Sequence, residues 1–321
     1  MTEADGPVPP AGRYLALGEA MVAFDAPSGR RLEDTAAVAV HVAGAELNVA
    51  VGLSRLGVPS AFAGAVGDDP WGRRVRKALG GEGVEASALR VDPKRPTGLL
   101  FKEGTAGGAL RVHYRRRGSA AAAYRGGAVL ERLLADCRGL HLTGISLVVG
   151  EALRATSIEA VERLPEGAYL SFDLNVRRTL AAAPAWHAGL ERVARRADLV
   201  LATVEELDAV GVDVPALGRD LAGRGGALLA RDGAGTEGYA ADGRLRVLAP
   251  PPVGPVVDTV GAGDAYAAAV IAMRLAGAGW EVAVRAGHLA GGFAVGTLGD
   301  YEGAPDAREL DMLLGGNFLS R

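Results

Sequence analysis

Short apolar runs alternate with amphipathic stretches along most of the chain. The apolar runs have the length of β-strands; they are Tyr14–Leu17, Ser60–Ala65, Gly139–Leu142, Ala168–Phe172, Leu199–Ala202 and Ala227–Ala230. Between several of them, apolar positions recur at helical spacing, in Leu47–Leu56, Trp71–Leu79, Glu151–Leu164, Ala185–Ala197 and Glu205–Val210. Strands that alternate with helices predict βαβ units and a mostly parallel sheet with helices on both faces. The pattern therefore places the chain in the α/β class.

Two segments interrupt this alternation because they contain strand candidates with no helix between them. They are Leu32–Val42 and Thr97–Arg117, and the second consists of two runs joined by a glycine-rich turn. Such strands outside a parallel sheet would form an antiparallel flap, which we expect to act as a lid. A plain surface hairpin with exposed arginines explains the same residues equally well.

Composition excludes several classes of protein and partner. The chain has 321 residues, and its single cysteine, Cys137, rules out an intrachain disulfide and a multi-thiolate metal site. With 35 Lys and Arg against 38 Asp and Glu, and 5% aromatic residues, we expect no surface for nucleic acid. The apolar stretch Ala265–Met273 is too short to span a membrane, and residues 1–12 lack a signal-peptide pattern. We therefore expect a cytoplasmic protein without a membrane partner, with one domain over residues 12–310 and a disordered tail at 1–11.

The strongest local signal is the segment V-D-T-V-G-A-G-D-A-Y, Val257–Tyr266, which leads into an alanine-rich helix predicted over Ala265–Leu275. Small residues allow close approach of a ligand, and the first N–H groups of a helix are unpaired donors that bind anions. We expect the backbone of Gly261, Ala262 and Gly263 to stabilise a phosphoryl group. Asp264 beside such a site would accept the proton of an attacking hydroxyl. The alternative is that Asp264 only caps the helix.

Two other nucleotide signatures fail on inspection. The chain contains no Gly-Lys pair and therefore no Walker A loop. Gly233–Gly238 matches G-x-G-x-x-G, but the residues that follow predict a strand, a turn and a second strand. A dinucleotide-binding fingerprint must open a helix, so a nicotinamide-dependent oxidoreductase is the weaker interpretation.

Asp258–Tyr266 resembles the C-terminal signature of the ribokinase-like (phosphofructokinase-B type) carbohydrate kinases. Ala43–Gly57, A-G-A-E-L-N-V-A-V-G-L-S-R-L-G, is similar to the N-terminal signature of that family, and Gly64–Gly72 and Gly144 match further stretches. The resemblance implies a three-layer sandwich with a small β lid. It also implies ATP-dependent phosphorylation of a primary hydroxyl of a sugar, with Mg²⁺ and a monovalent cation as candidate cofactors. Unpaired lid edges favour a homodimer or a larger homo-oligomer.

Within this family, three segments are similar to the 2-keto-3-deoxygluconate kinases: Y-R-R-R-G-S-A at Tyr114–Ala120, F-D-L-N-V-R at Phe172–Arg177, and G-D-Y-E-G-A-P at Gly299–Pro305. The resemblance implies that the acidic end of the sugar is held by Tyr114, Arg116 and Arg177, and that its hydroxyls contact Gly44 and Asn48. A guanidinium offers a planar fork of donors that matches a carboxylate. The alternative for Arg115–Arg117 is a solvated run of charge at a strand end.

The resemblance places the nucleotide on the C-terminal side of the chain. The residues implied to contact it are Thr203, Arg231, Gly233, Gly235, Gly238 and His288. Glu206 would organise water bound to magnesium near the phosphates, although a carboxylate in the first turn of a helix also serves the helix dipole.

Several residues depart from the pattern of the 2-keto-3-deoxygluconate kinases. Ala43 replaces the first glycine of a pair, and Leu100 occupies a lid position where those relatives often have tyrosine. A kinase for a neutral sugar such as fructose or ribose therefore stays open, as does a non-catalytic sugar or nucleotide sensor. Asp25 is interpreted either as a contact to a sugar hydroxyl or as the start of a turn. The remaining histidines are interpreted as structural; they are His41, His113, His141 and His187.

Overall fold

The computed structural model describes residues 12–27, 29–104, 110–241, 243–252 and 254–316. A nine-stranded sheet forms its centre, in the order β13-β12-β11-β10-β9-β8-β1-β4-β5. The strands are β1 (Tyr14–Leu17), β4 (Ser60–Gly67), β5 (Leu89–Asp92), β8 (Gly139–Thr143), β9 (Tyr169–Asp173), β10 (Leu199–Thr203), β11 (Ala227–Arg231), β12 (Gly235–Ala240) and β13 (Gly243–Leu248). The pairs from β5 to β11 are parallel, and β12 and β13 add an antiparallel edge.

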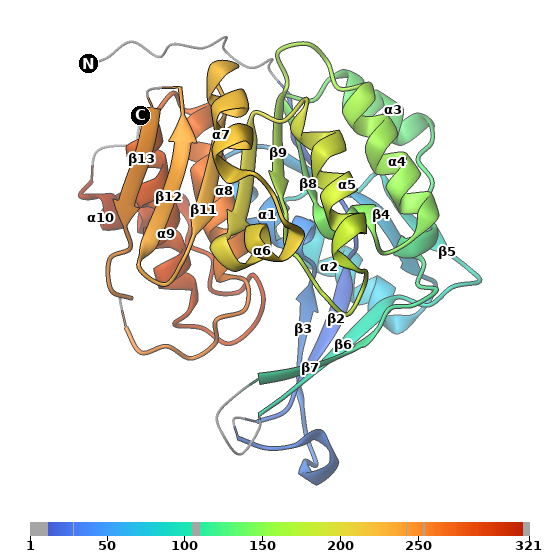
Figure 1. Cartoon of the computed structure of the whole chain (residues 1–321). Coiled ribbons are helices and arrows are strands. Elements are labelled where there is room, and N and C mark those ends of the chain that lie inside the picture. The colour runs from blue at the N-terminus through green and yellow to red at the C-terminus, as the bar shows by residue number, and fades with distance from the viewer. Residues whose placement is uncertain (1–11, 28, 105–109, 242, 253, 317–321) are drawn as a thin grey trace.

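Helices cover both faces of this sheet (Figure 1). One face packs against α3 (Ala128–Ala135), α4 (Glu151–Glu162), α5 (Ala183–Ala194), α6 (Val204–Val210) and α7 (Val214–Gly223). The other packs against α1 (Ala45–Arg55), α2 (Pro70–Gly81), α8 (Ala262–Leu275), α9 (Trp280–Ala294) and α10 (Ala307–Leu314). Short 3-10 turns lie at η1 (Leu32–Asp34), η2 (Ala121–Ala123) and η3 (Gly144–Leu147). The expected three-layer α/β sandwich is confirmed.

Burial on both faces explains why the strands appear in the sequence as continuous apolar runs. In β1, Leu15 and Leu17 face the α3–α7 side, whereas Tyr14 and Ala16 face the α1 and α8 side, and all four are fully buried. A strand covered on both faces has no polar face, so its pattern does not alternate. Strand β5 was not predicted, because it lies at the sheet edge and exposes half of its residues.

A second sheet of four strands, in the order β3-β2-β6-β7, projects from the main body and appears at the bottom of Figure 1. Its strands are β2 (Met21–Asp25), β3 (Ala39–Ala43), β6 (Gly98–Gly104) and β7 (Leu110–Arg115). The strands expected near 32–42 and 97–117 are present as β3, β6 and β7, with β2 between β3 and β6, and Leu32–Asp34 forms a 3-10 turn. This sheet is called the lid sheet below, after the role expected for it. The expectation of a purely antiparallel flap is wrong, because the central pair, β2 and β6, is parallel.

The two faces of this lid sheet are both apolar at its base. One face buries Met21, Ala23, Ala43 and Leu100 beside Tyr114. On the other face, the stacked rings of Phe24 and Phe101 lie 5.0 Å apart, and Trp71 of α2 meets Phe24 at 4.9 Å. The contact between Phe24 and Trp71 of α2 joins the sheet to the body, whereas the other contacts pack the four strands against one another.

The last described helix extends slightly beyond the expected domain boundary. Helix α10 continues to Leu314, four residues beyond the predicted boundary at 310. The tail predicted over residues 1–11 lies outside the described residues. In the described part of the chain, no helix combines the length and apolar character needed to cross a membrane.

Candidate active site

The glycine-rich loop meets helix α8 in the conformation that an anion site requires. Gly261 is the N-cap with φ +77°, and a Cβ there would lie 1.6 Å from the carbonyl oxygen of Asp300, so only glycine fits. Residues 261–264 are partly exposed, and the N–H groups of the first turn have no partner within the helix. Gly261, Ala262 and Gly263 therefore lie where the sequence predicts an anion pocket.

Asp264 lies in the first turn of α8 and is held from a second helix. Asn48 of α1 is 3% exposed and donates from Nδ2 to Oδ2 of Asp264 over 2.7 Å. Burial raises the pKa of Asp264 to about 7; the Asn48 hydrogen bond and Arg177 oppose the rise, whereas Asp173 and Asp300 add to it. The alternative of a plain helix cap is not what the structure shows, because the cap residue is Gly261 and the Asp264 side chain bonds Asn48. A carboxylate with a pKa near neutrality suits a proton acceptor.

Arg231 brings a guanidinium to the start of α8. Its Nη2 donates to Oδ2 of Asp173 over 3.0 Å, and its Nη1 donates to the carbonyl oxygen of Gly263 over 3.2 Å. The guanidinium also lies 5.0 Å from the ring centre of Tyr266. Burial alone would lower the pKa of Arg231, but Asp173 and its other acidic neighbours raise it, so the positive charge beside the anion pocket is permanent.

The predicted nucleotide segment forms the β11–β12 hairpin and not the start of a helix, as the sequence indicates. Asp232 accepts hydrogen bonds from the backbone of Ala234 and Gly235 and so closes the turn. A Cβ on Gly235 would meet the Val247 carbonyl oxygen at 2.3 Å, and a Cβ on Gly238 would meet that of Leu228 at 2.4 Å. Sheet packing therefore already requires these two glycines, whereas Gly233 has open space around it.

His288 of α9 faces the same hairpin. Its Nε2 lies 3.0 Å from Oγ1 of Thr236, which is also 3.1 Å from the hydroxyl of Tyr266. Burial and the charge of Arg231 lower the pKa of His288, so the ring is neutral at pH 7. The residue thus joins β12 to α8 and α9 behind the anion pocket.

Thr203 and Glu206 form a capping box at the start of α6, so Glu206 lies in the first turn, where the helix-dipole alternative places it, and it also bonds the cap residue. Thr203 Oγ1 accepts from the Glu206 backbone, and Glu206 Oε2 accepts from the Thr203 backbone over 2.8 Å. The other carboxylate oxygen of Glu206 accepts from the backbone of Val176 over 2.8 Å. Both oxygens of Glu206 therefore already have a protein partner.

Arg116, which the resemblance places at the acidic end of the sugar, is buried and paired with a carboxylate. It is 5% exposed, and its Nε donates to Oε2 of Glu19 over 2.7 Å, while Nη2 contacts the same oxygen. Ser119 Oγ donates to the other Glu19 oxygen over 2.8 Å. The alternative of a solvated charge run is wrong for Arg116, although Arg115 and Arg117 are exposed.

The other predicted sugar contacts lie around the lid base and the end of β9. Tyr114 packs in the lid sheet with its ring centre 5.3 Å from the Arg116 guanidinium. Arg177 is partly exposed and donates to the Val176 carbonyl oxygen over 3.1 Å. Gly44 caps α1 at φ +143°, where a Cβ would lie 2.3 Å from the Glu19 carbonyl oxygen. Asn48 keeps a buried Oδ1 without a hydrogen-bond partner among the described residues.

Sequence reasoning missed a cluster of charges beside the anion pocket. Lys102 of β6 is 3% exposed and lies within ion-pair distance of Asp25, Asp258 and Asp300. No motif joins them, since they come from four separate segments; the one signal in the sequence is the rarity of lysine, which occurs only at positions 77, 94 and 102.

Asn175, which follows β9, belongs to the F-D-L-N-V-R segment but was given no role from the sequence. Its φ of +44° lies in the left-handed region that Asn tolerates better than most residues. Its side-chain Oδ1 is buried without a described partner. The turn at Asn175 lets the backbone N–H of Val176 donate to Glu206, and it brings Arg177 close enough to lower the pKa of Asp264. The strained backbone of Asn175 therefore lies at the candidate site.

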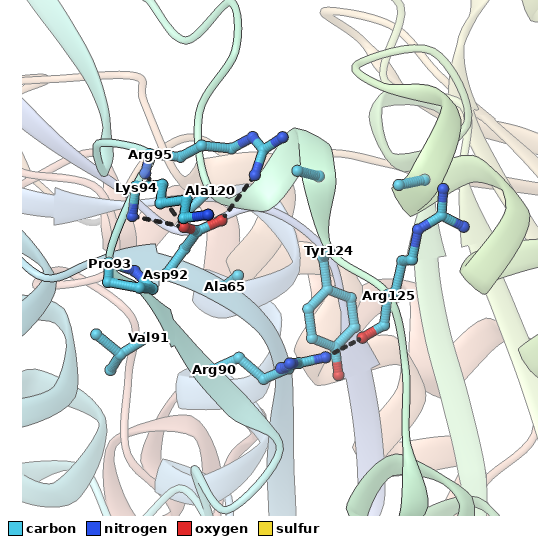
Figure 2. A pocket seen from close by; sticks show the side chains of 12 residues that line it. Ala65, Arg90, Val91, Asp92, Pro93, Lys94, Arg95, Ala120, Tyr124 and Arg125 are labelled. Carbon is cyan, nitrogen blue, oxygen red and sulfur yellow. Dashed lines mark hydrogen bonds and ion pairs between the residues drawn. The ribbon is translucent and has the colours of Figure 1, made fainter.

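A basic cleft of about 470 Å³ lies elsewhere, beside edge strand β5. In its lining, Arg95 contacts Asp92, three residues earlier in the chain, and Arg90 contacts the carbonyl oxygen of Arg125 (Figure 2). Both distances are 3.2 Å. Its lining includes none of the residues around Asp264. In the described part of the chain, no group of three or more His, Cys, Asp or Glu side chains could by itself hold a metal ion.

The sequence matches the family described as pfkB family carbohydrate kinase over residues 12–307. The protein belongs to this family. The resemblance drawn from its two signatures is thereby confirmed, and the chain is a sugar kinase that transfers phosphate.

Three curated relatives are similar to this kinase. The 2-dehydro-3-deoxygluconokinase of Bacillus subtilis is 33% identical, with 94% of each chain covered. The 2-dehydro-3-deoxygalactonokinase of Haloferax volcanii is 30% identical, with 85% of this chain and 87% of that one covered. The fructokinase of Rhizobium leguminosarum bv. trifolii is 32% identical, with 73% and 72% covered.

Solved structures show the same fold. A PfkB protein from Polaromonas sp. JS666 superposes with a TM-score of 0.81 at 31% identity, covering 94% of this chain and 99% of that one. An E. coli protein described as a ribokinase II, solved in complex with ATP and Mg²⁺, superposes with a TM-score of 0.83 at 25% identity and the same coverage.

Proposed function

We propose that this kinase transfers the γ-phosphoryl group of ATP to the primary hydroxyl of 2-keto-3-deoxygluconate, giving the 6-phosphate. The observation that carries the chemistry is the Asp264 carboxylate, held by Asn48 at 2.7 Å beside the unpaired N–H groups of the α8 terminus. The names of two relatives, which act on 2-dehydro-3-deoxy sugar acids, support the substrate class. The E. coli structure with ATP supports the nucleotide.

In this proposal Asp264 accepts the proton of the attacking hydroxyl as the new O–P bond forms. The N–H groups of Gly261, Ala262 and Gly263 stabilise negative charge on the phosphoryl group, with about 3 kcal/mol for each well-placed donor. Arg231, whose Nη1 bonds the Gly263 carbonyl, adds a fixed positive charge. The reaction needs little covalent work from the protein, so positioning and charge stabilisation dominate.

We propose that Thr203, Gly233, Gly235, Gly238 and His288 border the nucleotide along the β11–β12 hairpin and α9. Magnesium fits near this border because Asp173 keeps a buried Oδ1 without a described hydrogen-bond partner, a hard oxygen of the kind that Mg²⁺ and its waters prefer. Each carboxylate oxygen of Glu206 already accepts one hydrogen bond from a backbone N–H. Glu206 would therefore accept a hydrogen bond from a magnesium-bound water through the second lone pair of one of these oxygens. When bound, magnesium would neutralise phosphate charge.

For the sugar acid we propose that Arg177 carries most of the carboxylate recognition. Its guanidinium has a carbonyl oxygen as its hydrogen-bond partner, whereas that of Arg116 is neutralised by Glu19. Arg116 then acts on the sugar mainly by holding Tyr114 in place (5.3 Å). The side-chain Oδ1 of Asn48 and the backbone of Gly44 would contact hydroxyl groups of the sugar.

The second candidate is a kinase for a neutral sugar such as fructose. Two observations favour it: Leu100 is 5% exposed in the lid base and offers no hydroxyl, and Glu19 cancels one of the two predicted carboxylate-binding charges. A non-catalytic sensor is disfavoured because the Asp264–Asn48 pair is intact. A monovalent cation, a homo-oligomer and a cytoplasmic location stay predictions.

The deciding experiment is a phosphoryl-transfer assay with ATP and Mg²⁺ over matched acidic and neutral sugars. We expect kcat/KM for 2-keto-3-deoxygluconate or its 4-epimer to exceed that for fructose and ribose by at least about tenfold, the ratio that 1.4 kcal/mol of differential binding produces. A higher value for a neutral sugar would reject the acidic substrate in favour of the second candidate.

A further inference from the structure

A lysine on the lid reaches into the loops that build the anion pocket. Lys102 is the fifth residue of β6, and its side chain is 4% exposed. Its Nζ lies 2.9 Å from Asp300 Oδ1, 3.5 Å from Asp25 Oδ2 and 3.7 Å from Asp258 Oδ2. Only Asp25 belongs to the same sheet as the lysine; it ends the neighbouring strand β2.

The other two carboxylates belong to the catalytic loops. Asp258 lies six residues before Asp264 in the glycine-rich loop, and its Oδ1 accepts from the Val260 backbone over 3.0 Å. The carbonyl oxygen of Asp300 packs where a Cβ of Gly261 would be, so the anion pocket rests directly on Asp300. A displacement of Asp300 would therefore displace the N-cap of α8.

Asp300 is also connected to the base. Its Oδ2 accepts from Asn48 Nδ2 at 3.5 Å, the same amide group that donates to Asp264 at 2.7 Å. A short path of contacts thus runs from Lys102 through Asp300 and Asn48 to Asp264. Asn48 divides its donors between two carboxylates, and the charge of Lys102 determines how strongly Asp300 competes for them.

A second lid residue contacts the same loop. His41 of β3 lies with Nδ1 3.0 Å from Glu302 Oε1, and Glu302 Oε2 accepts from the backbone of Asp300 and Tyr301. Nε2 of His41 lies 3.9 Å from Asp25. The lid therefore contacts the 300–302 loop at two points, through Lys102 and through His41.

Charge balance makes the lysine necessary. Three buried carboxylates face one ammonium, and neither oxygen of Asp25 has a hydrogen-bond partner among the described residues. Burial disfavours the charged form of Lys102, but Asp300, Asp25 and Asp258 raise its pKa above the ordinary value, so the ammonium stays charged. A buried charge that loses its partner is strongly destabilised.

We propose that Lys102 is a positioning residue that couples the lid to the catalytic loops: its ammonium fastens β6 to Asp258 and Asp300 and so assembles the anion pocket and the Asn48–Asp264 pair only when the lid is in place. This inference rests on the proposed kinase function of Asp264. When the lid lifts, Asp258 and Asp300 lose their counterion beside the position of the triphosphate, and the pocket loses its affinity for anions. The lid thereby permits phosphoryl transfer only when it covers the sugar and excludes water.

The test compares Lys102→Met, which keeps the length and removes the charge, with Lys102→Arg, which keeps the charge. Lys77→Met on the exposed side of α2 is the matched control. We expect Lys102→Met to lower kcat by about 100-fold, as for a loss of about 1 Å in positioning, and Lys102→Arg to restore it to within about fivefold. Unchanged kcat in Lys102→Met, or no rescue by Lys102→Arg, would overturn the proposal.

A pH profile separates positioning from simple loss of stability. Asp264 is faced by Asn48 from α1, by Asp173 and Arg177 from β9 and the turn after it, by Arg231 from β11, and by Asp300. Without Lys102, the negative charge of Asp300 is uncompensated, so the rising limb of kcat/KM should move to higher pH. A purely structural lysine would leave the limb where it is in the folded fraction, and that result would contradict the proposal.

Amide hydrogen exchange tests the coupling without any activity. Lys102→Met should increase exchange in β6, β7 and residues 257–263, and leave α5 unchanged. If that variant does not fold, the double variant Lys102→Met/Asp300→Asn, which removes opposite charges together, replaces it; protected lid strands and catalytic loop in the double variant would refute the coupling. If the natural protein phosphorylates no sugar, the proposed function fails, whereas the exchange result still decides whether Lys102 fastens the lid.

Discussion

The raised pKa of Asp264 predicts how activity depends on pH. Burial, Asp173 and Asp300 bring the pKa of Asp264 to about 7. If this carboxylate is the base, the ionised fraction is about 10% at pH 6 and about 90% at pH 8, because each pH unit changes the ratio of the two forms tenfold. We therefore expect kcat/KM for the sugar to rise about ninefold over that interval. A carboxyl group at its ordinary pKa near 4 would give a flat profile.

Asn48 provides the perturbation that links this profile to the structure. Its 2.7 Å hydrogen bond stabilises the charged form of Asp264. A hydrogen bond to a charged group contributes about 1.5–3 kcal/mol, and one pKa unit corresponds to 1.36 kcal/mol. Replacing Asn48 by Ala should therefore move the rising limb upward by about one pH unit or more.

The assay is steady-state phosphoryl transfer at saturating ATP and Mg²⁺ between pH 5.5 and 9.5. The titration of ATP is common to the natural protein and the Asn48→Ala variant, so the difference between their profiles reports Asp264. A flat profile in the natural protein, or the same midpoint in both proteins, would refute the assignment of Asp264 as the base.

Three further predictions use the same assay together with thermal unfolding. Asp264→Asn should lower kcat by at least about 100-fold. Since the pKa of Asp264 in the folded state is about 7 and its ordinary value is near 4, this group lowers stability as pH rises from about 4 to about 7, and the full loss is present above that range. The Asn variant cannot ionise and should therefore raise Tm at pH 8, whereas an unchanged kcat would contradict the role of Asp264 as the base. Arg177→Ala should raise KM for an acidic sugar by about tenfold or more, and KM for a neutral sugar should stay within about twofold of the natural value. Arg178→Ala, at an exposed residue, is the control. Equal effects on both sugars would reject Arg177 as the carboxylate ligand. Arg116→Met leaves the buried Glu19 without its partner and should lower the free energy of unfolding, measured by urea titration, by about 3–5 kcal/mol. The double variant with Glu19→Gln should recover most of this loss. A stable Arg116→Met protein with only a raised KM would instead indicate that Arg116 contacts the sugar directly.

Much of the fold could be predicted from the sequence because the buried parallel strands appear as continuous apolar runs. Strands β1, β4, β8, β9, β10 and β11 all fall on such runs. Helix α9 was not predicted, although part of its surface is buried and part is exposed. The central lid strand β2 was missed because Met21–Asp25 lies only three residues after β1, where the chain leaves one sheet for the other.

The candidate site divides in the same way. Asp264 and the glycine-rich loop could be identified because their chemistry is local: a helix terminus, small residues and one carboxylate within a few positions. The partner of Arg116 could not be predicted, since Glu19 is 97 residues away in the sequence. Glu206 could be given two roles in sequence, and only the structure shows that both of its oxygens bond the backbone.

The order of residues along the chain was enough to determine the central strands of the sheet, the start of α8 at the glycine-rich loop and the type of chemistry, because each depends on neighbours in sequence and on periodic burial. Which charges neutralise one another was decided by tertiary structure alone. Lys102 meets Asp300 across 198 positions and Asn48 meets Asp264 across 216. Electrostatic energies depend on distance in space and on burial, and neither quantity is encoded in the local pattern.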